Sequence, residues 1–153
     1  MGPDRGRRCQ GDHGFVGGSE GILFGVVVFV FGTLILFNAW AVIDAKMAVS
    51  SAARETARTL VEGDGNVSVA VAAGRAAFEA TSDFDVAGLG APDITGEFRR
   101  CGRIEVTYRY DVPAISLPGG LGWGDGFDVS ATHSEIVDPF RSGLEGEAAC
   151  DAP

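Results

Sequence analysis

The residues that could carry out chemistry in this 153-residue chain are few and widely spaced. His133 lies in a segment with strand-like alternation, and no serine, cysteine or carboxylate stands at a catalytic spacing from it. The other histidine, His13, belongs to a different part of the chain. The sequence has no CxxC, no HExxH, no acidic calcium loop and no glycine-rich phosphate loop followed by lysine. We therefore predict no enzyme activity, no cofactor, no metal site and no small-molecule substrate.

An unbroken apolar run covers residues 21–43 (GILFGVVVFVFGTLILFNAWAVI). It carries no charged side chain, and Thr33 and Asn38 are its only clearly polar residues. Roughly 20 such residues in a helix cross the hydrocarbon core of a bilayer, and a backbone buried in lipid must be helical. The run predicts one transmembrane helix, with the lipid membrane as a partner and Trp40 as an interfacial anchor.

The charges on either side of this run predict its orientation. Arg5, Arg7 and Arg8 precede it, which favours a cytoplasmic N-terminus and an extracytoplasmic C-terminal domain in the cytoplasmic membrane. Acidic and basic residues balance within 1–20 and the run itself is uncharged, so the net charge of −9 falls on residues 44–153. Such an acidic domain has no basic stripe, which argues against nucleic acid as a partner.

The three cysteines fall on different sides of the predicted span. Cys9 precedes it, so only Cys101 and Cys150 could pair with each other. An oxidising exterior permits a disulfide between them. The alternative is two unpaired thiols, because Cys150 lies in a tail, residues 143–153, that we expect to be disordered.

Helical spacing continues beyond the apolar run as far as the cluster Gly63-Asp64-Gly65, which predicts a single helix of about forty residues, half of it in lipid. Small residues form one stripe on its second half: Ala41, Ala45, Ala48 and Ala52. This stripe predicts close helix packing. Gly21 and Gly25 form a GxxxG pair that would let two spans approach closely, and general helix packing or chance is the alternative.

The remaining elements predict an α+β fold. Asn66 or Ser68 would cap a second, Ala-rich helix that runs to about Ser82 and packs antiparallel on the first. The composition of residues 86–96 predicts a loop. Strict alternation over 102–112 predicts a strand with one buried face, 127–137 a second strand, and 96–101 is a candidate third. We expect this small antiparallel sheet to pack on the helices, because a lone hairpin is marginally stable.

Several sequence features, each of low specificity alone, follow one another along the chain. They are the boundary GFVGGSEG, the apolar span, the segment AVSSAARETARTL, the segment VTYRYDVPAISLPG and the segment VSATHSEIVDPFRSG. In this order the chain resembles the TadE-like family of tight-adherence (Flp) pilus assembly proteins, within the type IV pilin-like group, over most of residues 14–142. The resemblance implies a leader at 1–20, a span at 21–43, an extracytoplasmic pilin-like domain at 44–142, and other pilin-like subunits and an assembly platform as partners.

The resemblance also implies a processing and assembly site at Gly14, Phe15 and Glu20. A carboxylate at the membrane boundary is poorly solvated, which favours pairing with the free amine of a neighbouring processed subunit. The alternative is a helix N-terminal charge favoured by the macrodipole. The family usually cleaves after glycine and has glutamate fifth in the mature chain, whereas cleavage after Gly14 would make Glu20 sixth and cleavage after Phe15 would make it fifth.

Two other functions fit parts of the sequence. Ala39-Trp40-Ala41 has the form of a signal-peptidase site, and cleavage after Ala41 would release a secreted soluble domain. A single-pass membrane scaffold or sensor is the other alternative, with an N-terminal segment too short to hold an output domain. We expect a membrane-anchored pilus assembly protein or minor pilin that acts by protein-protein packing.

Overall fold

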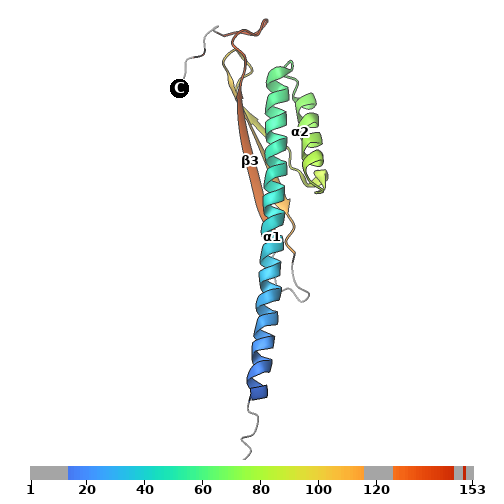
Figure 1. Cartoon of the computed structure of the whole chain (residues 1–153). Coiled ribbons are helices and arrows are strands. Elements are labelled where there is room, and N and C mark those ends of the chain that lie inside the picture. The colour runs from blue at the N-terminus through green and yellow to red at the C-terminus, as the bar shows by residue number, and fades with distance from the viewer. Residues whose placement is uncertain (1–13, 116–125, 147–149, 151–153) are drawn as a thin grey trace, which may run out of the picture. The chain divides into compact units, whose positions relative to one another are not determined.

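The computed structural model describes residues 14–115, 126–146 and 150. The chain divides into two compact units, Met1–Leu36 and Phe37–Pro153, and each is described separately. The α+β fold is confirmed: a long helix, a second shorter helix and a three-stranded antiparallel sheet (Figure 1).

Helix α1 spans Gly14–Glu62, so it begins well before the predicted start at residue 21. Residues 14–20 of the expected leader therefore belong to the helix, and residues 1–13 lie outside the described part of the chain. Extending a formed helix costs far less than nucleating one, and no proline interrupts this segment. At the other end the helix stops where predicted: the Gly63 N–H donates to the Thr59 carbonyl at 2.9 Å, and Gly65 follows with φ +70°.

In the first unit, α1 displays large apolar side chains to its surroundings, among them Ile22, Phe24 and Phe29. The helix contains a stretch with mean hydropathy 2.5, and it is long and apolar enough to cross a membrane. No other helix in the described ranges is both long and apolar enough to cross a membrane. This helix is consistent with a single-pass membrane anchor.

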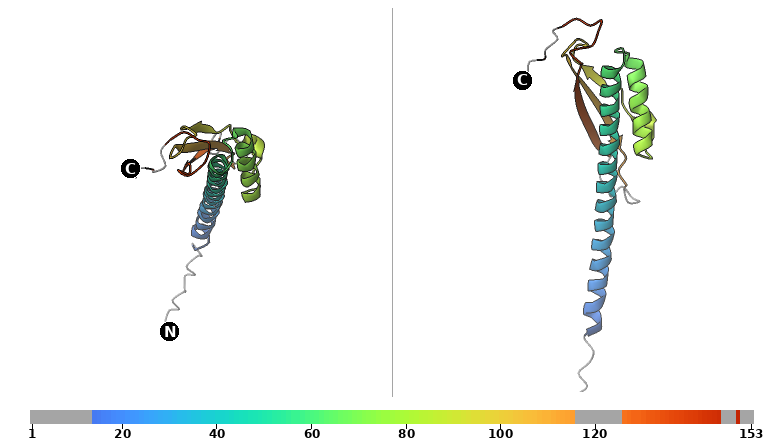
Figure 2. Two further views of the ribbon diagram at one scale, coloured as in Figure 1. Left: turned by 90° about the horizontal axis from the view of Figure 1, so that it is seen from above. Right: turned by 45° about the horizontal axis from the view of Figure 1, so that its top comes forward.

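In the second unit, the later part of α1 and helix α2 (Val67–Thr81) lie on one face of the sheet (Figure 2). The prediction that Asn66 caps α2 is confirmed: its side chain accepts the N–H groups of Ser68 and Val69 at 3.1 and 3.3 Å. A short 3-10 helix, η1 (Val86–Gly88), follows α2 within the predicted loop.

The sheet has the strand order β1-β2-β3. Strands β2 (Arg103–Val112) and β3 (Phe127–Ile136) pair antiparallel along their whole length, close to the predicted bounds. Every second residue of β2 is buried, as its alternation predicts. These are Ile104, Val106, Tyr108, Tyr110 and Val112. The opposite face is polar, and the Thr107 and Thr132 hydroxyls share a hydrogen bond of 2.8 Å across it.

The third strand lies earlier than expected. It is β1 (Asp93–Thr95), paired with Glu105–Thr107, and residues 96–102 form the connection to β2. Gly96 has φ +107°, and a Cβ there would lie 2.1 Å from the Arg103 carbonyl oxygen. The chain therefore turns at Gly96, where the sequence interpretation had placed the start of a strand.

The C-terminal segment is also more ordered than expected. Leu144 packs against the hydrophobic core, and the Arg100 N–H donates to the Glu145 carbonyl at 2.9 Å. The expectation of a disordered tail was therefore wrong for residues 143–146 and for Cys150. Residues 147–149 and 151–153 lie outside the described part of the chain.

Candidate functional site

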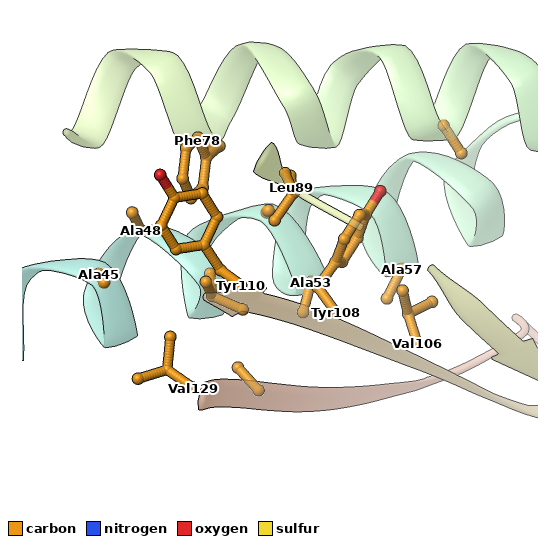
Figure 3. Close-up of a cluster of buried hydrophobic side chains, with 14 of the residues drawn as sticks. Ala45, Ala48, Ala53, Ala57, Phe78, Leu89, Val106, Tyr108, Tyr110 and Val129 are labelled. Atoms are coloured by element: carbon orange, nitrogen blue, oxygen red, sulfur yellow. The ribbon is translucent and has the colours of Figure 1, made fainter. Parts of the chain in front are cut away.

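The alanine stripe of α1 faces the core of its own domain. Ala45, Ala48 and Ala52 are fully buried, and Ala41 is half-buried against the same cluster. Figure 3 shows Ala45 and Ala48 among aromatic and apolar residues from α2 and the sheet. The stripe therefore packs helices closely, as its composition predicts, but within one chain, and its buried part offers no surface to another subunit.

Gly74 of α2 lies where the two helices approach each other closely. A Cβ built on Gly74 would lie 1.9 Å from Thr56 Oγ1 and 2.9 Å from the Ala52 carbonyl oxygen. Real Cβ atoms do not approach other atoms so closely. Glycine is therefore required here so that α2 can lie directly on the small-residue face of α1.

Two tyrosines from β2 reach past α1 toward α2 (Figure 3). The Tyr108 and Thr56 hydroxyls share a hydrogen bond of 3.1 Å beside Gly74. The Tyr110 ring packs 5.3 Å from that of Phe78, centroid to centroid, in a tilted arrangement. Burial raises the pKa of both phenols, with the Thr56 hydrogen bond partly opposing the rise at Tyr108.

These two phenols are the only tyrosines of the chain, so alkaline titration reports on the core directly. Because burial raises the folded-state pKa, their contribution to stability is complete below pH 10.0, the ordinary phenol pKa, and is lost as the pH rises through the folded-state pKa. We expect phenolate absorbance of the folded chain to appear at a higher pH than that of the denatured chain. Coincident titrations would contradict the burial of Tyr108 and Tyr110, and Tyr108→Phe would isolate the Tyr110 signal.

Asn38 is a functional candidate that the sequence interpretation noted only as a polar residue in the apolar run. Its side chain is 4% exposed. Asn38 Oδ1 accepts the Ile115 N–H at 2.9 Å, and Nδ2 donates to the Ile115 carbonyl at 3.1 Å. This pair of bonds holds the chain just after β2 against α1.

Arg141 closes the far end of α1, a role that its position in the sequence did not indicate. Its guanidinium donates to the carbonyls of Val61 and Gly63 and lies 5.4 Å from the Phe98 ring centroid. The last carbonyls of a helix have no partner within the helix. Arg141 supplies donors and a favourable charge there.

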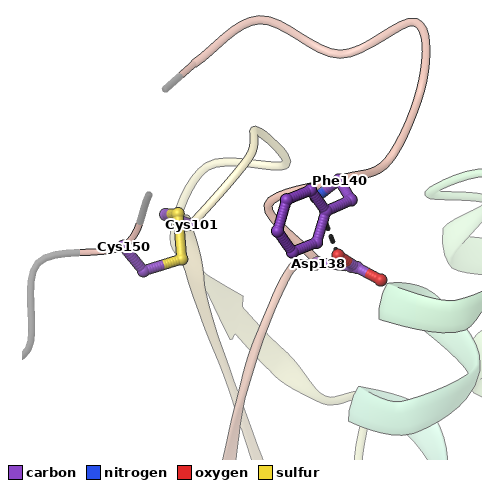
Figure 4. The surroundings of a disulfide bond; sticks show 4 residues. All are labelled: Cys101, Asp138, Phe140 and Cys150. Carbon is purple, nitrogen blue, oxygen red and sulfur yellow. Dashed lines mark hydrogen bonds between the residues drawn. A yellow bond between two sulfur atoms is a disulfide. The ribbon is translucent and has the colours of Figure 1, made fainter. Parts of the chain in front are cut away.

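Cys101 and Cys150 form a disulfide, with Cα atoms 5.2 Å apart. Figure 4 shows it beside the segment that contains Asp138 and Phe140, where the Phe140 N–H donates to Asp138 Oδ1 at 2.8 Å. The bond links the connection between β1 and β2 to the C-terminal segment.

The processing and span residues lie in the first unit. Gly14 is the first residue of α1, Phe15 is helical, and Glu20 is exposed. A Cβ added to Gly21 or Gly25 would meet nothing within 4 Å, so that face of the helix is open.

Among the described residues, no group of three or more His, Cys, Asp or Glu could hold a metal ion. His133 Nε2 and Glu135 Oε1 lie within hydrogen-bond distance of each other on β3, at 3.0 Å, and both side chains are partly exposed.

Protein-family models, curated proteins and solved structures were compared with the chain. No significant match was found in any of them.

Proposed function

We propose that this protein is a membrane-anchored component of a pilus-type assembly, a TadE-like minor pilin or pilus assembly protein, that acts by protein-protein packing. One observation carries the proposal. A single continuous helix, α1, has exposed apolar side chains in its first part and fully buried small residues in its second part, where an α+β domain packs on it. Such a helix carries both a lipid anchor and a packing face in one chain segment.

The proposed orientation has the N-terminus in the cytoplasm and the acidic domain outside. The basic residues before the span favour it. The disulfide between Cys101 and Cys150 supports it, because disulfides persist in oxidising compartments outside the cytosol.

Partner subunits would pack on surfaces other than the buried part of the alanine stripe. Gly21 and Gly25 remain open on the apolar part of α1 and would allow close contact with another span. The membrane-edge carboxylate of Glu20 would pair with the amine of a neighbouring processed subunit.

Secretion after cleavage at Ala41 is the first alternative, and the second unit disfavours it. Cleavage there would remove Asn38, whose side chain holds the Ile115 backbone, and would cut α1 at a residue packed against the core. A single-pass scaffold or sensor is the second alternative. It shares the anchor and differs in having no assembled fibre as a product.

The role of Glu20 can be tested in cells that make the chain at its native level. We expect deletion of the chain and Glu20→Gln each to lower the amount of fibre in the sheared surface fraction several-fold, because the neutral amide cannot pair with an amine. The control is Glu62→Gln, an exposed glutamate at the other end of α1.

Two results would count against this account. Unchanged fibre after deletion of the chain would contradict the proposed function. If deletion of the chain removes the fibre but Glu20→Gln still assembles it fully, only the proposed role of Glu20 is contradicted. For Glu20→Gln and Glu62→Gln, membrane fractionation must show that the substituted chain is still inserted.

A further inference from the structure

The contact between Asn38 and Ile115 lies on the apolar side of the first charges that follow the span. Asn38 precedes Asp44, the first charged residue after the run, by six residues, which is about 9 Å along a helix. On the strand side, Asp111 precedes Ile115 by four residues, about 13 Å of extended chain. The nearest charged residue on each element, Asp44 or Asp111, is therefore separated from the contact by a similar length of chain.

The polar groups at this contact are paired with each other. Asn38 is 4% exposed, and its amide satisfies both the N–H and the carbonyl of Ile115. Pro113, two residues earlier, has no N–H to satisfy. Unpaired amides are costly in lipid, and irregular backbone reaches membrane depth only where its polar groups are satisfied.

The surroundings of the contact are apolar and exposed. Trp40, Ile43 and Ile115 are 63%, 54% and 50% exposed, respectively. No charged residue occurs in 37–43 or 113–115. We name these three side chains the membrane-border surface. Two of them continue the line of apolar residues of α1, and tryptophan is enriched at the boundary between lipid and water.

We infer that the membrane-border surface enters the bilayer interface, so that residues 113–115 are seated in the lipid beside the end of the span. The domain then contacts the bilayer directly, and no exposed length of helix separates the two. The inference rests on the membrane anchoring proposed above and goes beyond it, because an anchored domain need not touch lipid. The partner is the phospholipid surface itself, with Asn38 setting the depth at which the strand end is held.

The test uses the full-length chain, with its disulfide intact, in phosphatidylcholine vesicles. A fluorescent unnatural amino acid replaces Ile115, Val67 or Phe29 in three separate variants. Val67 is the matched control, since it is β-branched and as exposed as Ile115 (50%), but it begins α2 beyond the far end of α1. Phe29 lies within the apolar run and reports the anchor. Quenching by lipid with a nitroxide high on the acyl chain is compared with quenching by aqueous iodide.

We expect lipid nitroxide to quench the probe at 115 several-fold more strongly than the probe at 67, and iodide to show the reverse order. The inference would be overturned if iodide quenched the probes at 115 and 67 equally and more strongly than lipid nitroxide did, while lipid nitroxide quenched the probe at 29. That result would leave the membrane anchoring unaffected. Quenching of the probe at 29 by iodide would instead contradict the anchoring, and with it both proposals.

Discussion

Replacing Cys150 with serine is expected to lower the free energy of unfolding of the domain by about 4 kcal/mol, from the loop-closure entropy of a long cross-link. The bond spans 49 residues of sequence and joins the connection between β1 and β2 to the C-terminal segment. Without it, the segment retains the packing of Leu144 and the hydrogen bond between Arg100 and Glu145. The measurement is denaturant unfolding of the full chain in detergent micelles, followed by near-ultraviolet circular dichroism.

Cys150 is the better of the two cysteines to change. Cys101 has φ +60°, so a substitution there would also alter a residue held in the left-handed region. The control is Cys9→Ser, which removes a thiol outside the bond. A reductant should shift the unfolding midpoint of the wild type toward that of Cys150→Ser and leave the variant unchanged. Equal midpoints for wild type and Cys150→Ser would contradict the stabilising role of the disulfide.

Replacing Gly74 with leucine is expected to destabilise the domain by about 3 kcal/mol or more, because an overpacked contact forces the backbone to move. Even the first carbon of the new side chain would lie 2.9 Å from the Ala52 carbonyl oxygen, a main-chain atom of α1 that no side-chain rotation can displace. The same carbon would lie 1.9 Å from Thr56 Oγ1, so Thr56 would have to move and would lose its hydrogen bond with Tyr108. The same unfolding experiment measures the loss.

The control for Gly74→Leu is Ala72→Leu, which places the same side chain on the exposed face of the same helix. Since leucine has nearly the helix propensity of alanine, we expect a change within about 0.5 kcal/mol there. Equal losses for Gly74→Leu and Ala72→Leu would mean that α2 is not in contact with α1 at Gly74.

The elements that local chemistry specifies could be predicted closely. The alternation from Ile104 to Val112 places one face of β2 in the core, and Asn66 begins α2 because its side chain accepts backbone N–H groups. The end of α1 at Glu62 follows from the glycine cluster after it. Each of these signals lies within a few residues of the feature it predicts.

The features that the sequence did not predict depend on partners distant along the chain. The amide of Asn38 is held by a residue 77 positions away, and Arg141 binds carbonyls about 80 positions before it. In the sequence, Gly74 only lowers the helix propensity of an Ala-rich segment. The need for glycine becomes visible once the place where α2 packs on α1 is known. Strand β1 has three residues, too few for alternation to be visible. The spacing of the alanines predicts a packing face. The neighbouring residues do not indicate whether that face packs against another element of the same chain or against another subunit.

In the function proposed here, α1 remains part of the mature protein and anchors it in a membrane. The most direct test is intact-mass and N-terminal analysis of the protein recovered from native membranes and from the medium. We predict a membrane-bound chain that retains the span and Asn38, with a terminus at Phe15 or Val16 if the leader is processed as in pilins. A chain that begins at Val42 and is found in the medium would contradict the account.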